Sequence, residues 1–180
     1  MSEVTRVYAG RLAGMVVRGP ETDVIGRVRD VVVNVRPAGH QSRVLGLVVE
    51  MMNKRRIFLP MLRIASIDPH EIMLVSGSVS LRAFKPRTGE LTIMGDIIGA
   101  KVQVDDPDLP KIHAKPVEVA DIEIERTRTR DWAISAVAVI SERAKFGRRT
   151  EILIASWKHV HGITAAGVGI SDAAAELLAE

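Results

Sequence analysis

The 180-residue sequence repeats itself, because several segments of its second half match segments of its first half in the same order. Three pairs of segments align: residues 7–17 with 92–102, 30–33 with 121–124, and 59–67 with 155–163. In the first pair each segment carries two glycines four positions apart, Gly10 and Gly14 in one and Gly95 and Gly99 in the other. Self-similarity of this kind predicts two copies of one supersecondary unit, with small loop insertions between them.

The composition favours β structure in both copies. Hydrophobic residues make up 47% of the chain and charged residues 26%, which is enough apolar surface for a folded core. The 23 valines and 17 isoleucines outnumber the 12 leucines, and β-branched side chains pack better on a pleated sheet than in a helix. We therefore predict a mainly β fold of two tandem small β-barrels, one at residues 1–80 and one at residues 88–166.

Apolar runs and alternating patterns predict the strands. They cover residues 26–35, 44–51, 56–59 and 72–75 in the first copy, and 117–125, 132–140 and 151–154 in the second. The step from Val119 to Ile122 breaks the alternation and indicates a β-bulge. Residues 10–14 predict a tight or helical turn. Residues 171–180 begin with an N-cap serine and continue with strong helix formers, so they predict a short C-terminal helix.

Several classes of protein are disfavoured by what the sequence lacks. It contains no cysteine, which excludes disulfides and thiolate metal sites. No apolar run approaches the roughly 18 to 20 residues that a membrane helix needs. The formal net charge of +3 is too small to identify an anionic partner by itself. We expect a cytoplasmic protein with no membrane span in this chain.

Basic residues gather in two hairpin connections that occupy equivalent places in the two copies. The predicted partner-binding residues are Lys54, Arg55 and Arg56 in the first connection and Arg143, Lys145, Arg148 and Arg149 in the second. Two basic hairpins at one end could present a face to phosphate or to an acidic protein, and solubilising hairpin tips are the alternative. Nucleic acid is the less favoured partner, because aromatic residues, which stack on bases, are only 3% of the chain.

No catalytic arrangement is visible, so we predict a protein that is not an enzyme and needs no cofactor. The chain contains no G-x-S-x-G, no P-loop and no G-x-G-x-x-G. His159 and His161 could face the same side of a strand but lack a carboxylate to complete a metal site. The acidic run at residues 105–108 predicts a solvated turn rather than a Mg²⁺ site. Asp30 and Asp121 occupy equivalent places and predict a structural role, as turn caps or hydrogen-bond acceptors.

Three segments of the first copy resemble the PRC-barrel family of small β-barrels. They read G-R-V-R-D-V-V-V at residues 26–33, V-L-G-L-V-V at 44–49 and L-P-M-L-R-I-A-S-I at 59–67. The second copy departs from the pattern, with Ser156 where the first has Pro60. The tandem copies, the phrase R-T-R-T-R-D-W at residues 126–132 and the C-terminal helix resemble more specifically the amino-terminal region of actinobacterial MgtE-like proteins.

This resemblance implies a pair of tandem PRC-type barrels that act as a non-catalytic binding or regulatory module. By the same resemblance the module would belong to a cytoplasmic protein linked to magnesium transport or homeostasis, with another protein or a second copy of itself as its partner. The alternative function is an adaptor for ribosomal or RNA-bound assemblies, from the likeness to the barrel of the ribosome-maturation factor RimM and from the paired basic hairpins. The resemblance brings no catalytic residues with it.

Overall fold

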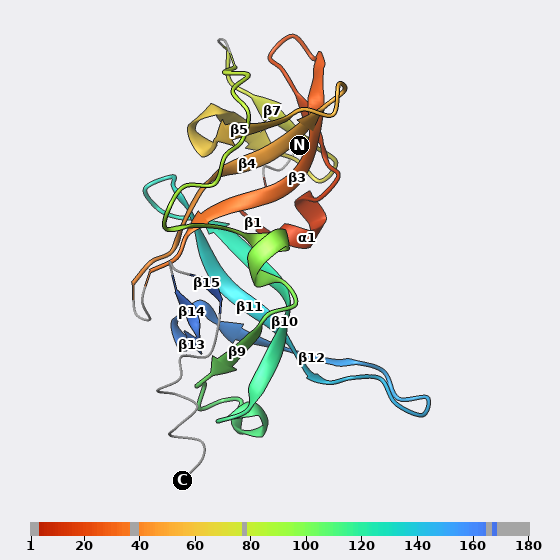
Figure 1. Cartoon of the computed structure of the whole chain (residues 1–180), viewed down its shortest axis with the longest axis vertical. Coiled ribbons are helices and arrows are strands. Elements are labelled where there is room, and N and C mark those ends of the chain that lie inside the picture. Colours follow the sequence, from red (N-terminus) through yellow and green to blue (C-terminus); the bar gives the residue numbers. More distant parts are fainter. Residues whose placement is uncertain (1–3, 37–39, 77–78, 165–166, 169–180) are drawn as a thin grey trace.

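The computed structural model describes residues 4–36, 40–76, 79–164 and 167–168, and strands dominate it (Figure 1). The first copy contains β1 (Arg6–Tyr8), α1 (Ala9–Leu12), β2 (Val16–Arg18), β3 (Val24–Asn34), β4 (Arg43–Met51), β5 (Arg56–Pro60), η1 (Met61–Arg63), β6 (Ile64–Ile67) and β7 (Glu71–Leu74). The second contains β8 (Glu90–Thr92), η2 (Ile93–Ile97), β9 (Lys101–Val104), η3 (Pro110–Ile112), β10 (Pro116–Arg126), β11 (Trp132–Glu142), β12 (Glu151–Ser156), η4 (Trp157–His159), β13 (Val160–His161), β14 (Ile163–Thr164) and β15 (Gly167–Val168). The mainly β prediction is confirmed, and every strand predicted from the sequence is present. The helix predicted at residues 171–180 lies outside the described residues.

The prediction of two closed barrels is wrong. The described strands form one large open sheet, in which β13, β9, β10, β11, β4, β3, β2, β7 and β6 are neighbours in that order, and a separate pair, β14 and β15. The large sheet runs through both copies because the start of β4 pairs with the start of β11, at Arg43 and Ala133. A barrel is a sheet whose first and last strands pair with each other, whereas this strand order is open, with β13 at one end and β6 at the other.

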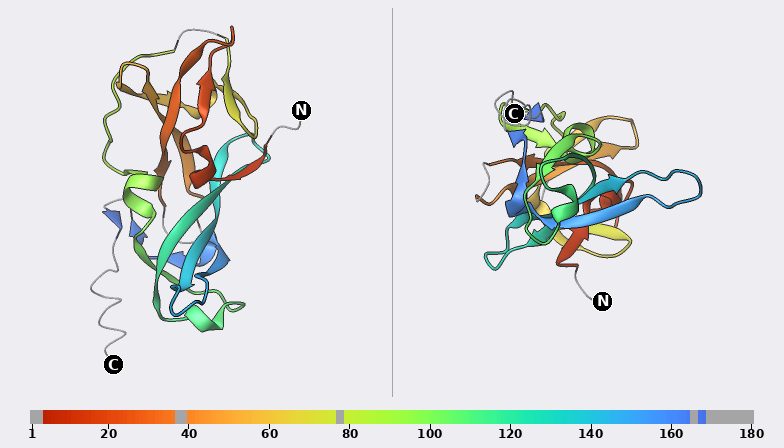
Figure 2. Two further views of the ribbon diagram at one scale, coloured as in Figure 1. Left: turned by 90° about the vertical axis from the view of Figure 1, so that its right-hand side faces the viewer. Right: turned by 90° about the horizontal axis from the view of Figure 1, so that it is seen from below.

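The two copies exchange their first strands. β1 pairs antiparallel with β10 of the second copy, with Val7 opposite Ile124. β8 pairs antiparallel with β3 of the first copy, with Leu91 opposite Val33. A short helical turn follows each of these strands, α1 after β1 and η2 after β8, so each turn also lies against the other copy (Figure 2).

An aspartate of each copy accepts hydrogen bonds from the helical turn of the other copy. Asp121 Oδ1 accepts from the backbone N–H of Gly10 at 3.0 Å. Asp30 accepts from the backbone N–H groups of Met94 and Gly95, at 2.8 Å and 3.0 Å. The structural role that the repeat predicts for these two aspartates is therefore confirmed, and their partners lie across the boundary between the copies.

Each aspartate lies next to a β-bulge. The register of β3 against β4 shifts between Val28 and Asp30, and that of β10 against β11 shifts between Val119 and Asp121. The bulge predicted in the second copy is confirmed, and the first copy has the same one. Because a bulge changes the direction in which the next side chain points, the extra residue directs each carboxylate toward the exchanged turn.

The repeated glycines meet two different requirements. A Cβ added to Gly10 would lie 2.7 Å from Oδ2 of Asp121, so a larger residue would push the turn away from its acceptor. Gly14 and Gly99 have φ angles of +82° and +86°, a conformation that L side chains rarely adopt. The first glycine of the pair allows close approach, and the second lets the chain turn into β2 or β9.

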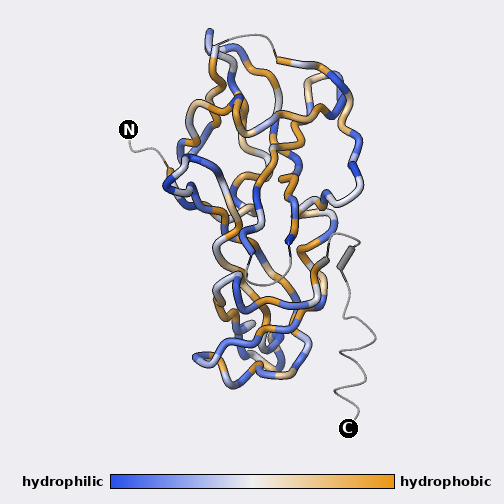
Figure 3. The backbone as a smooth tube through the Cα atoms, turned by 90° about the vertical axis from the view of Figure 1, so that its left-hand side faces the viewer, coloured by the Kyte–Doolittle hydropathy of each residue, from blue (hydrophilic) through white to orange (hydrophobic). Residues whose placement is uncertain are grey.

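One hydrophobic core extends through both copies. Buried valine, isoleucine and leucine side chains from both copies belong to a single cluster, and Figure 3 shows hydrophobic and hydrophilic residues alternating along the strands that supply it. At the junction of the copies Trp157 Nε1 donates a hydrogen bond to Ser42 Oγ at 3.1 Å, and both side chains are buried. The division into separate domains at residues 1–80 and 88–166 stays a prediction.

The exchanged turn should depend measurably on its acceptor. Replacing Asp121 by alanine removes the acceptor of the N–H groups of Gly10 and Ile122, so we expect Asp121→Ala to lower the free energy of unfolding by about 1–3 kcal/mol. Urea denaturation followed by circular dichroism measures the loss. Asp108→Ala is the control, because Asp108 is exposed and its side chain makes no hydrogen bond or ion pair within the described residues. An equal loss in both variants would contradict this role for Asp121.

A double-mutant cycle tests the close approach itself. Gly10→Ala should destabilise the wild type, because the new Cβ would collide with the Asp121 carboxylate. The same substitution should cost less in the Asp121→Ala background, where that oxygen is gone, with a coupling of about 0.5–3 kcal/mol. If the losses in the free energy of unfolding of the two single variants add up to that of the double variant, the effect of Gly10→Ala does not come from a collision with Asp121.

Candidate functional site

The β11–β12 hairpin projects from the molecule as an arm, by which we mean residues 143–154. Figure 2, in the view from below, shows its blue ribbon extending sideways beyond the other strands. Its tip turns at Phe146 and Gly147, both with positive φ, and the N–H of Arg148 donates to the carbonyl oxygen of Lys145 at 3.0 Å. The Phe146 side chain is fully exposed. The arm therefore presents an aromatic ring at its end.

The outer edge of β12 is apolar. Ile152 and Ile154 are 52% and 60% exposed, although isoleucine usually lies in the interior. Within the described residues β12 pairs with β11 on one side and has no strand on the other. Its outer edge therefore offers unpaired backbone groups beside exposed apolar side chains, the combination that adds a further strand most readily.

The equivalent edge of the first copy is covered. Residues 59–67 align with residues 155–163. Extending this alignment by one position makes Phe58 of β5 the equivalent of Ile154 of β12. The segment between the copies runs along β5, where Ala83 forms an antiparallel bridge with Ile57. The N–H of Phe84 donates to the carbonyl oxygen of Arg56 at 2.9 Å, and the ring of Phe84 lies 6.3 Å from that of Phe58, centre to centre. The chain itself thus shows how an extended segment fits this edge.

The predicted basic residues of the second hairpin lie on the arm, and most of them have no acidic partner. Arg143 pairs with Glu118. Lys145, Arg148 and Arg149 make no ion pair with any described residue, and together with Arg143 and Glu118 they line a cavity of about 530 Å³ at the base of the arm. Their role as partner-binding residues stays a prediction. The structure adds that three positive charges without an acidic partner among the described residues lie on the arm, at the cavity between it and β10.

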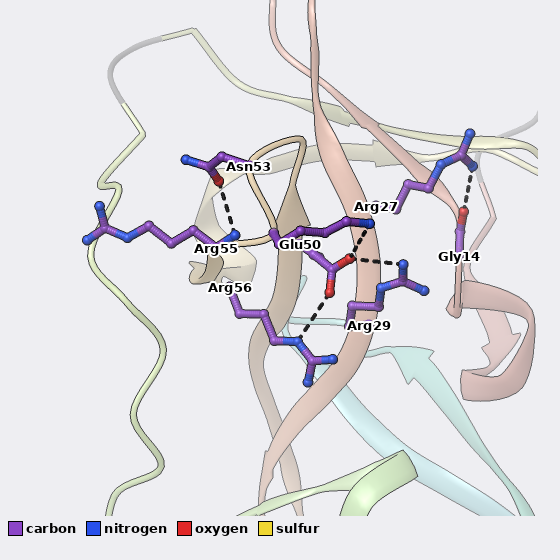
Figure 4. A network of polar contacts seen from close by, with 8 residues as sticks. Gly14, Arg27, Arg29, Glu50, Asn53, Arg55 and Arg56 are labelled. Carbon is purple, nitrogen blue, oxygen red and sulfur yellow. Dashed lines mark hydrogen bonds and ion pairs between the residues drawn. The ribbon is translucent and has the colours of Figure 1, made fainter.

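The first basic hairpin differs, because a carboxylate already engages most of it (Figure 4). Glu50, whose side chain is 14% exposed, lies 3.1 Å from Arg29, 3.4 Å from Arg56 and 3.7 Å from Lys54. The pKa of Glu50 lies below its ordinary value, chiefly because Arg29 donates a hydrogen bond to the carboxylate. Partial burial opposes this shift, and Arg56 and Lys54 add to it. Only Arg55 of this hairpin has no acidic partner among the described residues.

The two basic hairpins do not form one face. The β4–β5 turn lies in the upper half of Figure 1, and the arm projects from the lower half. The exchange of first strands stacks the copies end to end, so equivalent hairpins lie far from each other. The geometry therefore supports binding by the arm alone rather than by both hairpins together.

A second hollow lies at the junction of the copies. It is a cavity of about 270 Å³ lined by Arg43, Met61, Leu62, Arg130 and Trp132, among others. The alignment places Met61 where the second copy has Trp157, which donates a hydrogen bond to Ser42 and itself lines a smaller cavity of about 210 Å³. Among the described residues no segment occupies this cavity, so nothing here indicates its ligand.

Two of the acids weighed as metal ligands, Asp105 and Asp106, have ordinary structural contacts. Asp105 lies 3.1 Å from His113 Nδ1, and Asp106 accepts the backbone N–H of Asp108 at 2.9 Å. His159 and His161 lie on η4 and β13. Across the part of the chain that the structure describes, no three histidine or acidic side chains gather in a metal-binding group.

The sequence analysis missed the apolar half of the site. Residues 152–155 read I-L-I-A, so both faces of this strand are apolar. A strand that has one face on the core and one in water alternates instead. That departure was the available signal, together with Phe146 inside an otherwise basic turn. The exposure of Ile152 and Ile154 is visible only in the structure, where β5 of the first copy is covered by residues 83–84 and β12 is covered by no described residue.

Comparison with known proteins gives one family match. Residues 91–166 match a family described as the actinomycetes SH3 domain, which is less than half of the chain and covers the second copy from β8 to β14. A search of curated proteins finds no match. SH3 domains are non-catalytic modules that bind other proteins. No described helix is long and apolar enough to cross a membrane.

The resemblance to the PRC-barrel family and to MgtE-like proteins is wrong. No family of either kind matches the chain, and the open sheet is not a barrel. The motifs of the first copy indicate β-strands, and small β folds of different families share such strand motifs. They therefore do not identify the PRC-barrel family. The predicted link to magnesium transport rested on this resemblance, and nothing in the fold bears on it.

The Glu50 cluster predicts a pH dependence. A carboxylate whose pKa is lowered in the folded protein adds stability above its unfolded pKa, and the gain is lost as the pH falls through the lowered value. We expect Glu50→Gln to be less stable than the wild type at about pH 7, and the difference to shrink once the pH falls below the ordinary glutamate value of about 4.3. Urea unfolding at several pH values measures this. Glu21→Gln, on an exposed turn, should show no such trend, and a pH-independent Glu50→Gln effect would contradict the interpretation.

Proposed function

We propose that this protein is a non-catalytic protein-binding module that binds its partner along the outer edge of β12 and the adjoining arm. The observation that carries the proposal is the difference between two equivalent edges. In the first copy the segment at residues 83–84 covers β5. In the second copy no described residue covers β12, and its isoleucines are exposed.

The physical properties of this edge suit a partner. Natural proteins protect long apolar edge strands, because such edges pair with other chains. Exposed apolar side chains that lie together, with polar neighbours around them, mark interaction surfaces. The arm combines Phe146, Ile152 and Ile154 with cationic neighbours, so it can bury apolar area and select by charge at the same time.

The family match supports the same class of function. The matched residues, 91–166, include the whole arm, and SH3 domains bind proteins without catalysing a reaction. We therefore place this chain among binding modules rather than enzymes.

An RNA-associated adaptor is the second candidate. Lys145, Arg148 and Arg149 could contact phosphates. Phe146 is the only aromatic residue on the arm, however, and stacking on a single ring provides little affinity for a single strand. The apolar edge of β12 has no use in that function, so a protein partner accounts for more of the surface.

Two single substitutions test the proposed surface. Ile154→Asp should reduce capture of the protein's partner from a cell lysate by at least about tenfold, because it places a charge in the centre of the contact. The fold should keep its stability, since Ile154 is largely exposed. Leu62→Asp is the matched control, because Leu62 is 89% exposed and lies in the first copy. Equal capture by both variants would refute the site.

Because the chain has no cysteine, a cross-linker can be placed at one chosen position. A photoreactive group on Ile154→Cys should form a covalent product with the partner, and the same group on Leu62→Cys should not. Nuclease treatment before capture distinguishes a protein partner from one held through RNA. A cross-link that appears only without nuclease would favour the RNA-associated function.

A further inference from the structure

The partner's chemistry follows from the arm and from its covered counterpart. We infer that β12 binds an extended acidic segment of another protein, which adds as an antiparallel strand and places a large apolar side chain on Ile154. This inference rests on the proposed function and specifies its ligand.

The internal segment on β5 supplies the geometry. Ala83 bridges Ile57 in antiparallel orientation, and the N–H of Phe84 reaches the carbonyl oxygen of Arg56. The alignment of the copies places Leu153 at the position of Ile57 and Ile152 at that of Arg56. A ligand that repeats this pairing donates an N–H to the carbonyl of Ile152.

The same comparison indicates the ligand's apolar side chain. Phe84 contacts Phe58 through its ring, and Ile154 lies at the position of Phe58. Because isoleucine is smaller than phenylalanine and is left 60% exposed, a phenylalanine or similarly large residue of the ligand would find an uncovered apolar surface there.

The charge of the ligand follows from the ion pairs around the arm. Lys111 lies 3.2 Å from Glu142 and 2.5 Å from Glu151, and these contacts raise the pKa of Lys111 and lower that of Glu151. Glu118 pairs with Arg143 and Lys101. The acidic side chains near the arm are thus already engaged, whereas three of its cationic side chains are not.

The uncompensated charges are those of Lys145, Arg148 and Arg149. They would attract acidic residues that flank the apolar side chain of a ligand, and they would repel a basic segment. A second copy of this chain would bring a second set of the same positive charges to the contact. An acidic segment of a different protein therefore fits the arm better than self-association does.

Synthetic peptides test the inference with the full chain. The probe is a fluorescent ten-residue peptide with aspartate alternating with valine and one central phenylalanine, and the matched peptide has lysine in place of every aspartate. We expect the acidic peptide to bind at least about tenfold more tightly than the basic one, with an affinity that falls as salt is added. N-methylation of the phenylalanine amide should abolish binding, because it removes the strand-pairing donor.

Variants of the protein locate the contact. Ile154→Asp, and separately Arg148→Glu with Arg149→Glu, should each weaken binding of the acidic peptide by about tenfold or more. Arg55→Glu reverses one charge on the other hairpin and is the control, which should leave binding unchanged. Backbone amide shifts confined to residues 143–156 on titration would support the strand pairing.

Three outcomes would overturn the inference. The first is equal binding of the acidic and basic peptides, and the second is binding that N-methylation of the peptide does not change. The third is that the Ile154→Asp variant still binds the acidic peptide and that oligouridine displaces this peptide from the protein. If the acidic peptide fails to bind while the cross-link at position 154 persists, the inference fails and the binding module stands. If both are absent, the proposed function fails as well.

Discussion

The contact between each bulged aspartate and the helical turn of the other copy is the constraint on which the fold depends. Asp121 accepts from Gly10, and Asp30 accepts from Met94 and Gly95. Each first strand must cross to the other copy for these bonds to form, and the crossing adds two further strand pairs between the copies to the β4–β11 pair that joins the sheet. The exchanged turns are therefore held at both ends by aspartate side chains, through one hydrogen bond at Asp121 and two at Asp30.

Local features of this fold could be predicted from the sequence, and the exchange could not. The strands, the second-copy bulge and the structural role of the two aspartates follow from alternation and from the repeat. Each copy has a glycine-containing turn and an aspartate that can accept its N–H groups. The sequence therefore allows each turn to bind the aspartate of its own copy or that of the other copy. A repeat therefore predicts which segments resemble each other but leaves their partners ambiguous. The barrel prediction assumed that the first strand of each copy pairs within that copy. In the structure it pairs with the other copy.

The candidate site could be predicted only in part for a related reason. The basic residues of the arm are evident in the sequence, but those of the first hairpin look the same and are engaged by Glu50. Charge in a sequence does not show which cations are already neutralised. The apolar edge was less evident still, because its meaning depends on the absence of a cover that β5 possesses. The proposed binding function therefore rests on the differences between two similar copies.

An exposed apolar edge strand promotes aggregation, because it can pair with the same edge strand of another molecule. Fixed positive charges beside such an edge reduce this hazard, because two identical edges approaching each other bring like charges together. The same charges do not disfavour an acidic strand, for which they add attraction. Lys145, Arg148 and Arg149, which lie on the same hairpin as Ile152 and Ile154, suit the proposed binding of a partner of opposite charge. In the first copy residues 83–84 of the linker occupy this place, and Lys54 and Arg56 of the hairpin pair with Glu50.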